Sequence, residues 1–233
     1  MNKHKISPEL LNNVSTLSTN QKQNVFILSS NFDTTKKFLI KNKYEFTPYR
    51  FANCFNLNAE IDDIEIFSDE NSISFVYSNP IVQAETYEKN FINLEKLCEG
   101  KFYGQGQTIC FIDTGIFPHL DFIIPNNRII KFIDLINSTP SAYDDNGHGT
   151  FVAGVACGNG IFNSTYKGFA TRANIISIKA LSKDGNSNSN KILDAMQWIY
   201  ENHKVYNISV VCMSFGADYL NSTDPLSKGA EAL

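Results

Sequence analysis

The chain has 233 residues and a formal net charge of −4, with 42% hydrophobic and 19% charged residues. Its 18 Phe and 10 Tyr supply enough core-forming side chains to exclude intrinsic disorder for most of the length, which suits one large domain or two small ones. The 20 basic residues are outnumbered by 24 acidic ones and form no long basic run, which argues against nucleic acid as a partner. The charge pattern does not indicate a membrane surface either.

No stretch approaches the ~18 consecutive apolar residues of a membrane-spanning helix. Residues 1–19 are polar and lack the apolar region of a secretory signal peptide. The cysteines are odd in number and none has metal-ligand spacing, so we expect reduced, mostly buried thiols. These features predict a cytoplasmic protein and leave later release open. The five cysteines are Cys54, Cys98, Cys110, Cys157 and Cys212.

The first part of the chain has the pattern of a small α+β domain. Residues 1–22 are rich in Asn, Ser, Thr and Lys without sustained periodicity, which predicts a flexible or loosely helical leader. Residues 23–80 alternate between strand-like and helix-like segments, which predicts an α+β sandwich with helices on one face. Strands are expected at 24–29 and 73–77, helices at 33–41 and 59–67, and two apolar stretches between residues 44 and 57.

The rhythm changes after a connector at residues 81–106, which holds a short amphipathic piece at 91–94 and a glycine-rich turn. From residue 107 to 233, continuous apolar runs alternate with segments of helix length. Runs without polar alternation are typical of parallel strands covered on both faces, so this part is predicted to be α/β. The runs are 108–112, 129–136, 173–180 and 205–213, and the helical segments are 150–157 and 189–202.

Asp113 is the first candidate for chemistry. It follows the apolar run 108–112 and precedes Thr114-Gly115, so it lies where a buried strand emerges into a loop. Open α/β sheets place their sites at that edge. Taken alone, an Asp-Thr-Gly is more often a turn or a helix cap.

His148 is the second candidate, in the segment Asn146-Gly-His-Gly-Thr150. The two flanking glycines allow a tight turn and bring the ring close to neighbouring chain, and Thr150 can begin a helix of small residues. A lone histidine is more often a satisfied core or surface group. The two flanking glycines make a purely structural role for His148 less favoured here.

A third segment, 212–216, ends another apolar strand, and its order after Asp113 and His148 carries a resemblance. Throughout residues 107–230 the chain resembles the subtilisin-like serine proteases, or subtilases (peptidase family S8). Within that family it resembles the AprX-type bacterial members without a signal peptide. The intervening motifs that also match are Gly168 to Ala173, Lys179 to Leu181 and Asp184-Gly185.

The resemblance implies roles for particular residues. Asp113 would be the carboxylate that orients the imidazole of His148, and His148 would be the general base and then the general acid. Two edge strands would pair with an extended polypeptide substrate by main-chain hydrogen bonds, and Leu181 would border the subsite for the second residue. One edge would be Gly185, Asn186 and Ser187, and the other Ser214, Phe215 and Gly216.

The sequence departs from the family pattern in three places. Phe151 stands where a second His is usual, and Thr171 stands where a Pro is usual. The chain also stops at Leu233, before the family's oxyanion-hole Asn and Gly-Thr-Ser nucleophile motif, and Ser214 belongs to the substrate wall. Residues 224–233 read as the start of a helix with Pro225 in its first turn. We therefore expect an inactive fragment of a longer serine endopeptidase.

Residues 23–80 resemble in size and strand order the propeptide that caps many subtilases, whose tail lies in the cleft. This implies processing between about Tyr77 and Glu85, and Pro80 moves the expected cut into residues 81–85. The alternatives are a separate small binding domain over 23–80 and a surface linker after it.

Three other readings stay open from the sequence. A catalytically dead, subtilase-like binding or regulatory protein is the main alternative to an endopeptidase. A cysteine hydrolase built on Cys110 is remote. The chemistry that the resemblance implies requires no cofactor. Structural calcium is only a possibility, because Asp121 matches one ligand position of the family but residues 158–166 do not clearly match the companion loop. Asp144 and Asp145 could equally be solvated loop charges.

Overall fold

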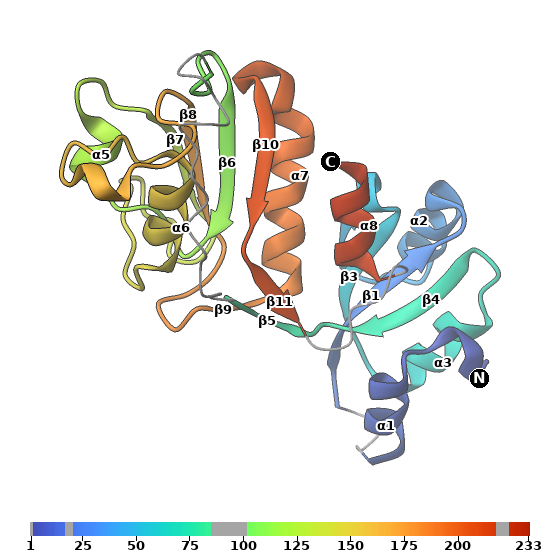
Figure 1. Cartoon of the computed structure of the whole chain (residues 1–233). Coiled ribbons are helices and arrows are strands. Elements are labelled where there is room, and N and C mark those ends of the chain that lie inside the picture. The colour runs from blue at the N-terminus through green and yellow to red at the C-terminus, as the bar shows by residue number, and fades with distance from the viewer. Residues whose placement is uncertain (1, 17–20, 85–101, 218–223) are drawn as a thin grey trace. The chain divides into compact units, whose positions relative to one another are not determined.

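The computed structural model describes residues 2–16, 21–84, 102–217 and 224–233 (Figure 1). The chain divides into two compact units. Unit 1 comprises Met1–Pro80 and Tyr219–Leu233, and unit 2 comprises Ile81–Asp218. The expected amphipathic piece at residues 91–94 lies outside the described residues.

Unit 1 is built on a four-stranded antiparallel sheet in the order β2-β3-β1-β4. The α+β class predicted for this part is confirmed. Its strands are β1 (Gln23–Ser29), β2 (Phe46–Tyr49), β3 (Cys54–Ala59) and β4 (Ile73–Ser78). Its helices are α1 (Pro8–Thr16), α2 (Phe32–Lys41), α3 (Ile61–Asp69) and α8 (Pro225–Ala232), with short 3-10 turns η1 (Lys3–Lys5) and η2 (Arg50–Ala52).

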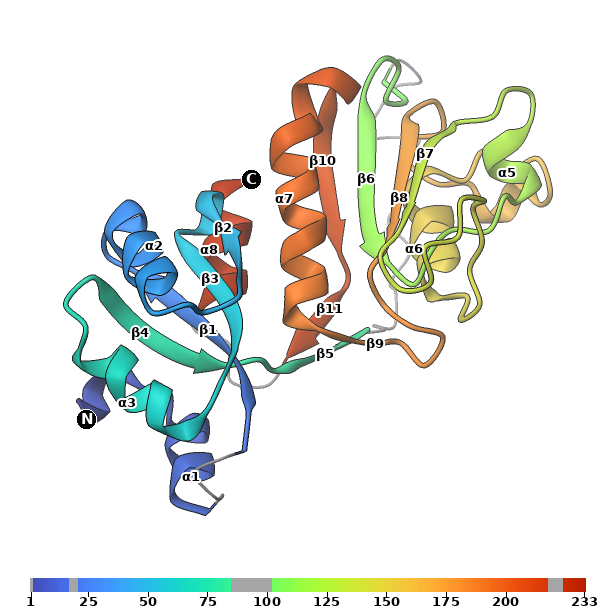
Figure 2. The ribbon, with the colours of Figure 1, turned by 180° about the vertical axis from the view of Figure 1, so that it is seen from behind.

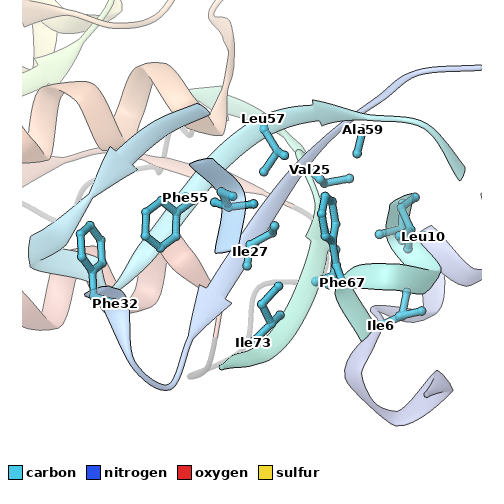
Figure 3. Packing of buried hydrophobic residues seen from close by; sticks show 13 residues of the cluster. Ile6, Leu10, Val25, Ile27, Phe32, Phe55, Leu57, Ala59, Phe67 and Ile73 are labelled. Carbon is cyan, nitrogen blue, oxygen red and sulfur yellow. The ribbon is translucent and has the colours of Figure 1, made fainter. Parts of the chain in front are cut away.

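One face of this sheet packs against α2 and α3 to form the core of unit 1 (Figure 3). Alternate side chains of a strand point to opposite faces, so Val25 and Ile27 of β1 both reach this core. The rings of Phe32 and Phe55 stack with centroids 4.4 Å apart. Apolar burial of this kind is the main stabilising contribution to a small domain.

Replacing Ile27 by alanine should destabilise unit 1 by about 2–5 kcal/mol, because the side chain is fully buried and its loss leaves a cavity. The matched control is Ile40→Ala in α2, where the side chain is 59% exposed and alanine favours the helix. Urea unfolding followed by circular dichroism measures both. Equal unfolding midpoints for the two variants would contradict this core assignment.

Part of the predicted leader is helical, as one of the two expectations had it, and packs into unit 1 rather than being a mobile segment. Ile6 and Leu10 are buried in the core, and Ser7 N–H donates to Val76 O at 2.9 Å. Burial of these two apolar side chains, four residues apart, holds this otherwise polar segment against the core. At the other end, α8 contacts η2 and begins as predicted with Pro225 in its first turn, capped by Asp224.

Unit 2 contains a four-stranded parallel sheet in the order β10-β6-β8-β7. Every residue of β6 is buried, so both faces of the sheet are covered, as the apolar runs predict. The predicted α/β class is confirmed. The strands are β6 (Thr108–Asp113), β7 (Ile129–Asp134), β8 (Asn174–Lys179) and β10 (Ile208–Met213).

Helices α6 (His148–Cys157) and α7 (Ser189–Tyr206) lie on opposite sides of this sheet (Figures 1 and 2). Two boundaries differ from the sequence prediction. Helix α6 begins at His148 rather than Thr150, and Val205 belongs to α7 rather than to the following strand. Asn207 ends α7 in the left-handed conformation, and Val205, in the last turn of this helix, is exposed. The short helices α5 (Leu120–Ile123) and η3 (Ser164–Tyr166) complete the unit.

A second, three-stranded antiparallel sheet lies in unit 2, in the order β11-β5-β9. Its central strand is β5 (Ile81–Ala84), between β9 (Asn186–Asn188) and β11 (Phe215–Ala217). Segments that are more than 100 residues apart in the sequence therefore form one small sheet.

The described cysteines are free thiols, as predicted. Cys54, Cys110 and Cys157 are buried and Cys212 is partly buried. Burial raises the pKa of the Cys157 thiol to about 12, so this thiol stays protonated at neutral pH. Within the described ranges, we find no helix with the length and hydropathy needed to span a bilayer.

Candidate active site

Asp113 and His148 form a buried hydrogen-bonded pair at the carboxyl edge of the parallel sheet. Asp113 is the last residue of β6 and His148 the first of α6, and Nδ1 of His148 lies 2.7 Å from Oδ1 of Asp113. Their side chains are only 2% and 6% exposed. An ionised carboxylate only accepts hydrogen bonds, so this contact places the ring proton on Nδ1 and leaves Nε2 with its lone pair.

The glycines on either side of His148 have different structural tasks. Gly147 caps α6 with φ +99°, a conformation that L side chains rarely adopt. Gly149 lies so close to the loop after β6 that an added Cβ would be 2.1 Å from Gly115 O. The first glycine makes the turn and the second lets His148 approach Asp113, which agrees with the sequence argument.

The charge of Asp113 depends on two opposing effects. Burial raises the pKa of its carboxyl, whereas hydrogen bonds with His148 and from Thr114 N–H stabilise the ionised form. The net direction is upward. A carboxylate that is desolvated in this way interacts strongly with a developing imidazolium, because few water molecules screen the pair.

Asp144 holds the loop that precedes His148, a role that the sequence analysis missed. Its carboxylate accepts hydrogen bonds from Thr114 Oγ1, Gly147 N–H and both N–H and Oγ1 of Thr150, at 2.6–2.9 Å. Burial alone would raise the pKa of Asp144, but these bonds outweigh it and leave the pKa below its ordinary value. Thr114 Oγ1 in turn accepts from Gly149 N–H at 2.9 Å, which ties the loop after β6 to α6.

Asp144→Asn should lower stability at pH 7 by about 2 kcal/mol, because an amide cannot accept all of these hydrogen bonds. A lowered folded-state pKa stabilises the fold above the unfolded carboxyl value of about 3.9, and this contribution is lost as the pH falls through the folded value. The difference from wild type should therefore shrink below about pH 4. Urea unfolding at pH 7 and pH 3 tests this, with the exposed Asp184→Asn as control. A difference that persists at pH 3 would contradict it.

Strand β5 lies in the groove between the two predicted edge strands. It pairs antiparallel with both neighbours: Gln83 is opposite Gly216 on β11 and Asn186 on β9. Ala84 N–H also donates to Gly185 O at 2.8 Å. The groove thus binds an extended chain through backbone hydrogen bonds on both sides.

The side chains of β5 alternate between the protein and solvent. Val82 is fully buried, whereas Ile81 is 61% exposed. A pocket of ≈ 510 Å³ lies at the other end of the strand. It is lined by Gln83, Ala84, Asn146, His148, Phe151, Asp184, Gly185 and Asn186. His148 therefore lines the same pocket as the end of the strand that occupies the groove.

The other residues predicted to border the substrate lie along the groove or next to Asp113. Phe215 and Gly216 pair with β5, Ser187 is opposite Val82, and Ser214 lies between β10 and β11. Leu181 is buried beside Asp113, whose carbonyl accepts its N–H at 3.1 Å.

Phe151 and Asn146 line the same pocket as His148. Phe151 is 54% exposed and lines the pocket. Asn146, singled out only as part of the motif, connects the two sides of the site: its Oδ1 accepts from His148 N–H at 3.1 Å and its Nδ2 donates to Lys183 O at 2.8 Å.

The residues near Asp121 do not match the donor set of a calcium site. Calcium takes six to eight oxygen ligands, which are carboxylates, backbone or amide carbonyls and waters. Oδ1 of Asp121 instead accepts from Phe162 N–H at 2.8 Å, and the guanidinium of Arg128 donates to the carbonyls of Asp121, Cys157 and Ala173. Among the described residues, no three His, Cys, Asp or Glu side chains gather around a possible metal position. No step below depends on a metal.

The fold and the geometry together define a class of protein: an α/β domain whose buried Asp–His pair lies beside a groove that holds an extended strand. Residues 104–232 match the Subtilase family of S8 peptidases, and the chain belongs to that family.

Relatives and solved structures agree with this placement. The chain is 32% identical over 214 residues to serine protease AprX of Bacillus subtilis, covering 86% of this chain and 48% of that protein. It is 31% identical over 145 residues to a thermostable alkaline protease of Halalkalibacterium halodurans, covering 61% and 37%. The crystal structure of the epidermin leader peptide processing serine protease of Staphylococcus aureus shares the fold, with TM-score 0.62, 14% identity and coverage of 91% and 56%. The chain thus spans about half the length of the first of these relatives.

Proposed function

We propose that the complete gene product is a serine endopeptidase that hydrolyses peptide bonds in extended polypeptides. The observation that carries the proposal is the buried 2.7 Å contact between Asp113 and His148, next to a groove already filled by a backbone-paired strand. Asp113 orients the ring and stabilises the imidazolium. His148 takes a proton from the nucleophile through Nε2 and returns it to the leaving amine.

The substrate would lie in the groove as β5 does. Its backbone would pair with β9 and β11, so recognition depends on an extended conformation more than on one side chain. The nucleophilic serine and the oxyanion donor would come from residues outside this chain. The 233-residue chain alone should therefore form no acyl-enzyme.

We also propose that β5 is the tail of a propeptide formed by residues 23–80. Ile81–Ala84 occupies the positions that a substrate would need, so access requires that this strand leave the groove. The strand is part of the same chain, and its high effective concentration favours occupancy until the chain is cut.

Hydrolysis of a denatured protein substrate tests the proposed function. The complete gene product should release peptides, and the purified 233-residue chain should release none. An inactive complete product that still binds extended peptides would favour the catalytically dead alternative. Hydrolysis by the purified chain would contradict the proposal that the nucleophile lies outside it.

A further inference from the structure

We propose that Lys179 is a positioning residue. It holds the loop after Asp113 and the loop before His148 at the separation at which the two side chains form their hydrogen bond. This inference deepens the proposed function, because it names the group that sets the geometry of the Asp–His pair. It rests on contacts within unit 2 that involve neither the nucleophile nor a substrate.

Lys179 lies at an unusual place for a charged residue. It is the last residue of β8 in the centre of the parallel sheet, and it is the register partner of Asp113 on β6 and Asp134 on β7. Its side chain is 0% exposed. Burying an ammonium group is costly unless it is fully paired, so its surroundings must supply compensating contacts.

The surroundings supply one acceptor for each of the three ammonium protons. Nζ of Lys179 donates to Thr114 O at 2.6 Å, to Oδ1 of Asp145 at 2.6 Å and to Leu181 O at 3.1 Å. It also lies 5.1 Å from the ring centroid of Tyr143, within the range of a cation–π contact. The donor capacity of the group is thereby used completely.

The three acceptors belong to three different parts of the site. Thr114 directly follows Asp113, Asp145 lies three residues before His148, and Leu181 leads toward the edge strand β9. One ammonium group therefore joins the carboxylate loop, the histidine loop and the substrate edge. The connection between the first two sets the separation of Asp113 and His148.

A charged group performs this task better than a neutral one of similar length. The contact with Asp145 is charge-assisted, and such bonds are shorter and about twice as strong as neutral ones. Without the ammonium group, Thr114 O and Leu181 O would lose a donor at the base of the site. The two loops would then be joined chiefly through the contacts of Asp144.

The proton of Nδ1 in His148 reports this geometry directly. A histidine proton shared with a carboxylate resonates far downfield in the NMR spectrum, and its exchange with water measures how firmly the pair is closed. The 233-residue chain, labelled with [¹⁵N]histidine, is the sample, and the His148→Gln variant assigns the signal. No peptidase activity is needed, so the result is separable from a failure of the proposed function.

Lys179→Met should abolish the downfield signal or speed its exchange at least about tenfold, while circular dichroism shows a folded chain. Asp145→Asn removes the charge of one acceptor and leaves the contacts of Lys179 with Thr114 O and Leu181 O in place. It should therefore also speed the exchange, but by a smaller factor than Lys179→Met. Lys131→Met removes an exposed lysine from neighbouring strand β7 and should leave the signal unchanged.

Unchanged exchange in a folded Lys179→Met variant would overturn the proposal. If that variant does not fold, Asp145→Asn decides, because Asp145 lies at the surface: unchanged exchange overturns the proposal and faster exchange supports it. Absence of the signal in the wild-type chain would also overturn it, since the Asp113–His148 bond itself would then be missing. An inactive complete product with a normal signal would count against the proposed function alone.

Discussion

In the complete gene product, Asp113→Asn should lower kcat by about 10⁴-fold and His148→Ala by about 10⁶-fold, each with a much smaller change in peptide binding. His148 is the group that moves the proton, so its removal leaves the nucleophile without a base. Asn at position 113 can donate a hydrogen bond to Nδ1 and so favours the tautomer with its proton on Nε2. Steady-state kinetics with a peptide amide measures both effects.

The control for this prediction is His203→Ala. His203 is an exposed histidine of α7 whose Nδ1 contacts Tyr200 O, and its removal should leave kcat within about twofold of wild type, as is usual for surface changes. Equal loss of substrate affinity with unchanged kcat in the His148 or Asp113 variants would contradict the assigned roles.

Self-processing should depend entirely on His148. In the purified complete product, the mature amino terminus should begin within residues 81–85. Gln83 and Ala84 line the pocket that His148 also lines, which favours a cut after Ala84. His148→Ala should remain uncut in a purified system. Amino-terminal sequencing and intact mass measure both, and the same cut in the His148 variant would remove the self-processing proposal.

A matched pair of variants separates recognition by the groove from simple exposure of a linker. Val82→Asp places a charge at a fully buried position and should slow the cut strongly, whereas Ile81→Asp changes a side chain that is 61% exposed and should slow it little. A linker cut by any contaminating protease would respond equally to both changes. Equal rates for the two variants would thus favour the linker.

The sequence contains strong local signals for the two central residues. Asp113 ends a continuous apolar run, and His148 lies between glycines, so each is placed by its immediate neighbours. The strands of the parallel sheet could be predicted because each is a continuous apolar run in the sequence. Val205 was placed wrongly because an apolar residue at the end of an amphipathic helix looks like the start of the strand that follows it.

The supporting residues could not be predicted in this way. The acceptors of Lys179 lie 65, 34 and 2 residues away in the sequence, and no local pattern joins them. Asp144 looked like a possible solvated loop charge because the sequence does not show that Gly147 and Thr150 turn back toward it, nor that Thr114, 30 residues away, becomes its neighbour. One signal was present: a lysine inside an apolar run needs a partner when it is buried, although the sequence does not say which acidic residue supplies it.

Labelling with a serine-directed phosphonate, followed by intact mass and peptide mapping, tests the central claim most directly. The complete gene product should gain one phosphonyl group on a single serine beyond Leu233, and His148→Ala should prevent it. The purified 233-residue chain should gain none. Stoichiometric labelling of the chain itself, or peptide hydrolysis by a complete product that the phosphonate neither labels nor inhibits, would contradict the account.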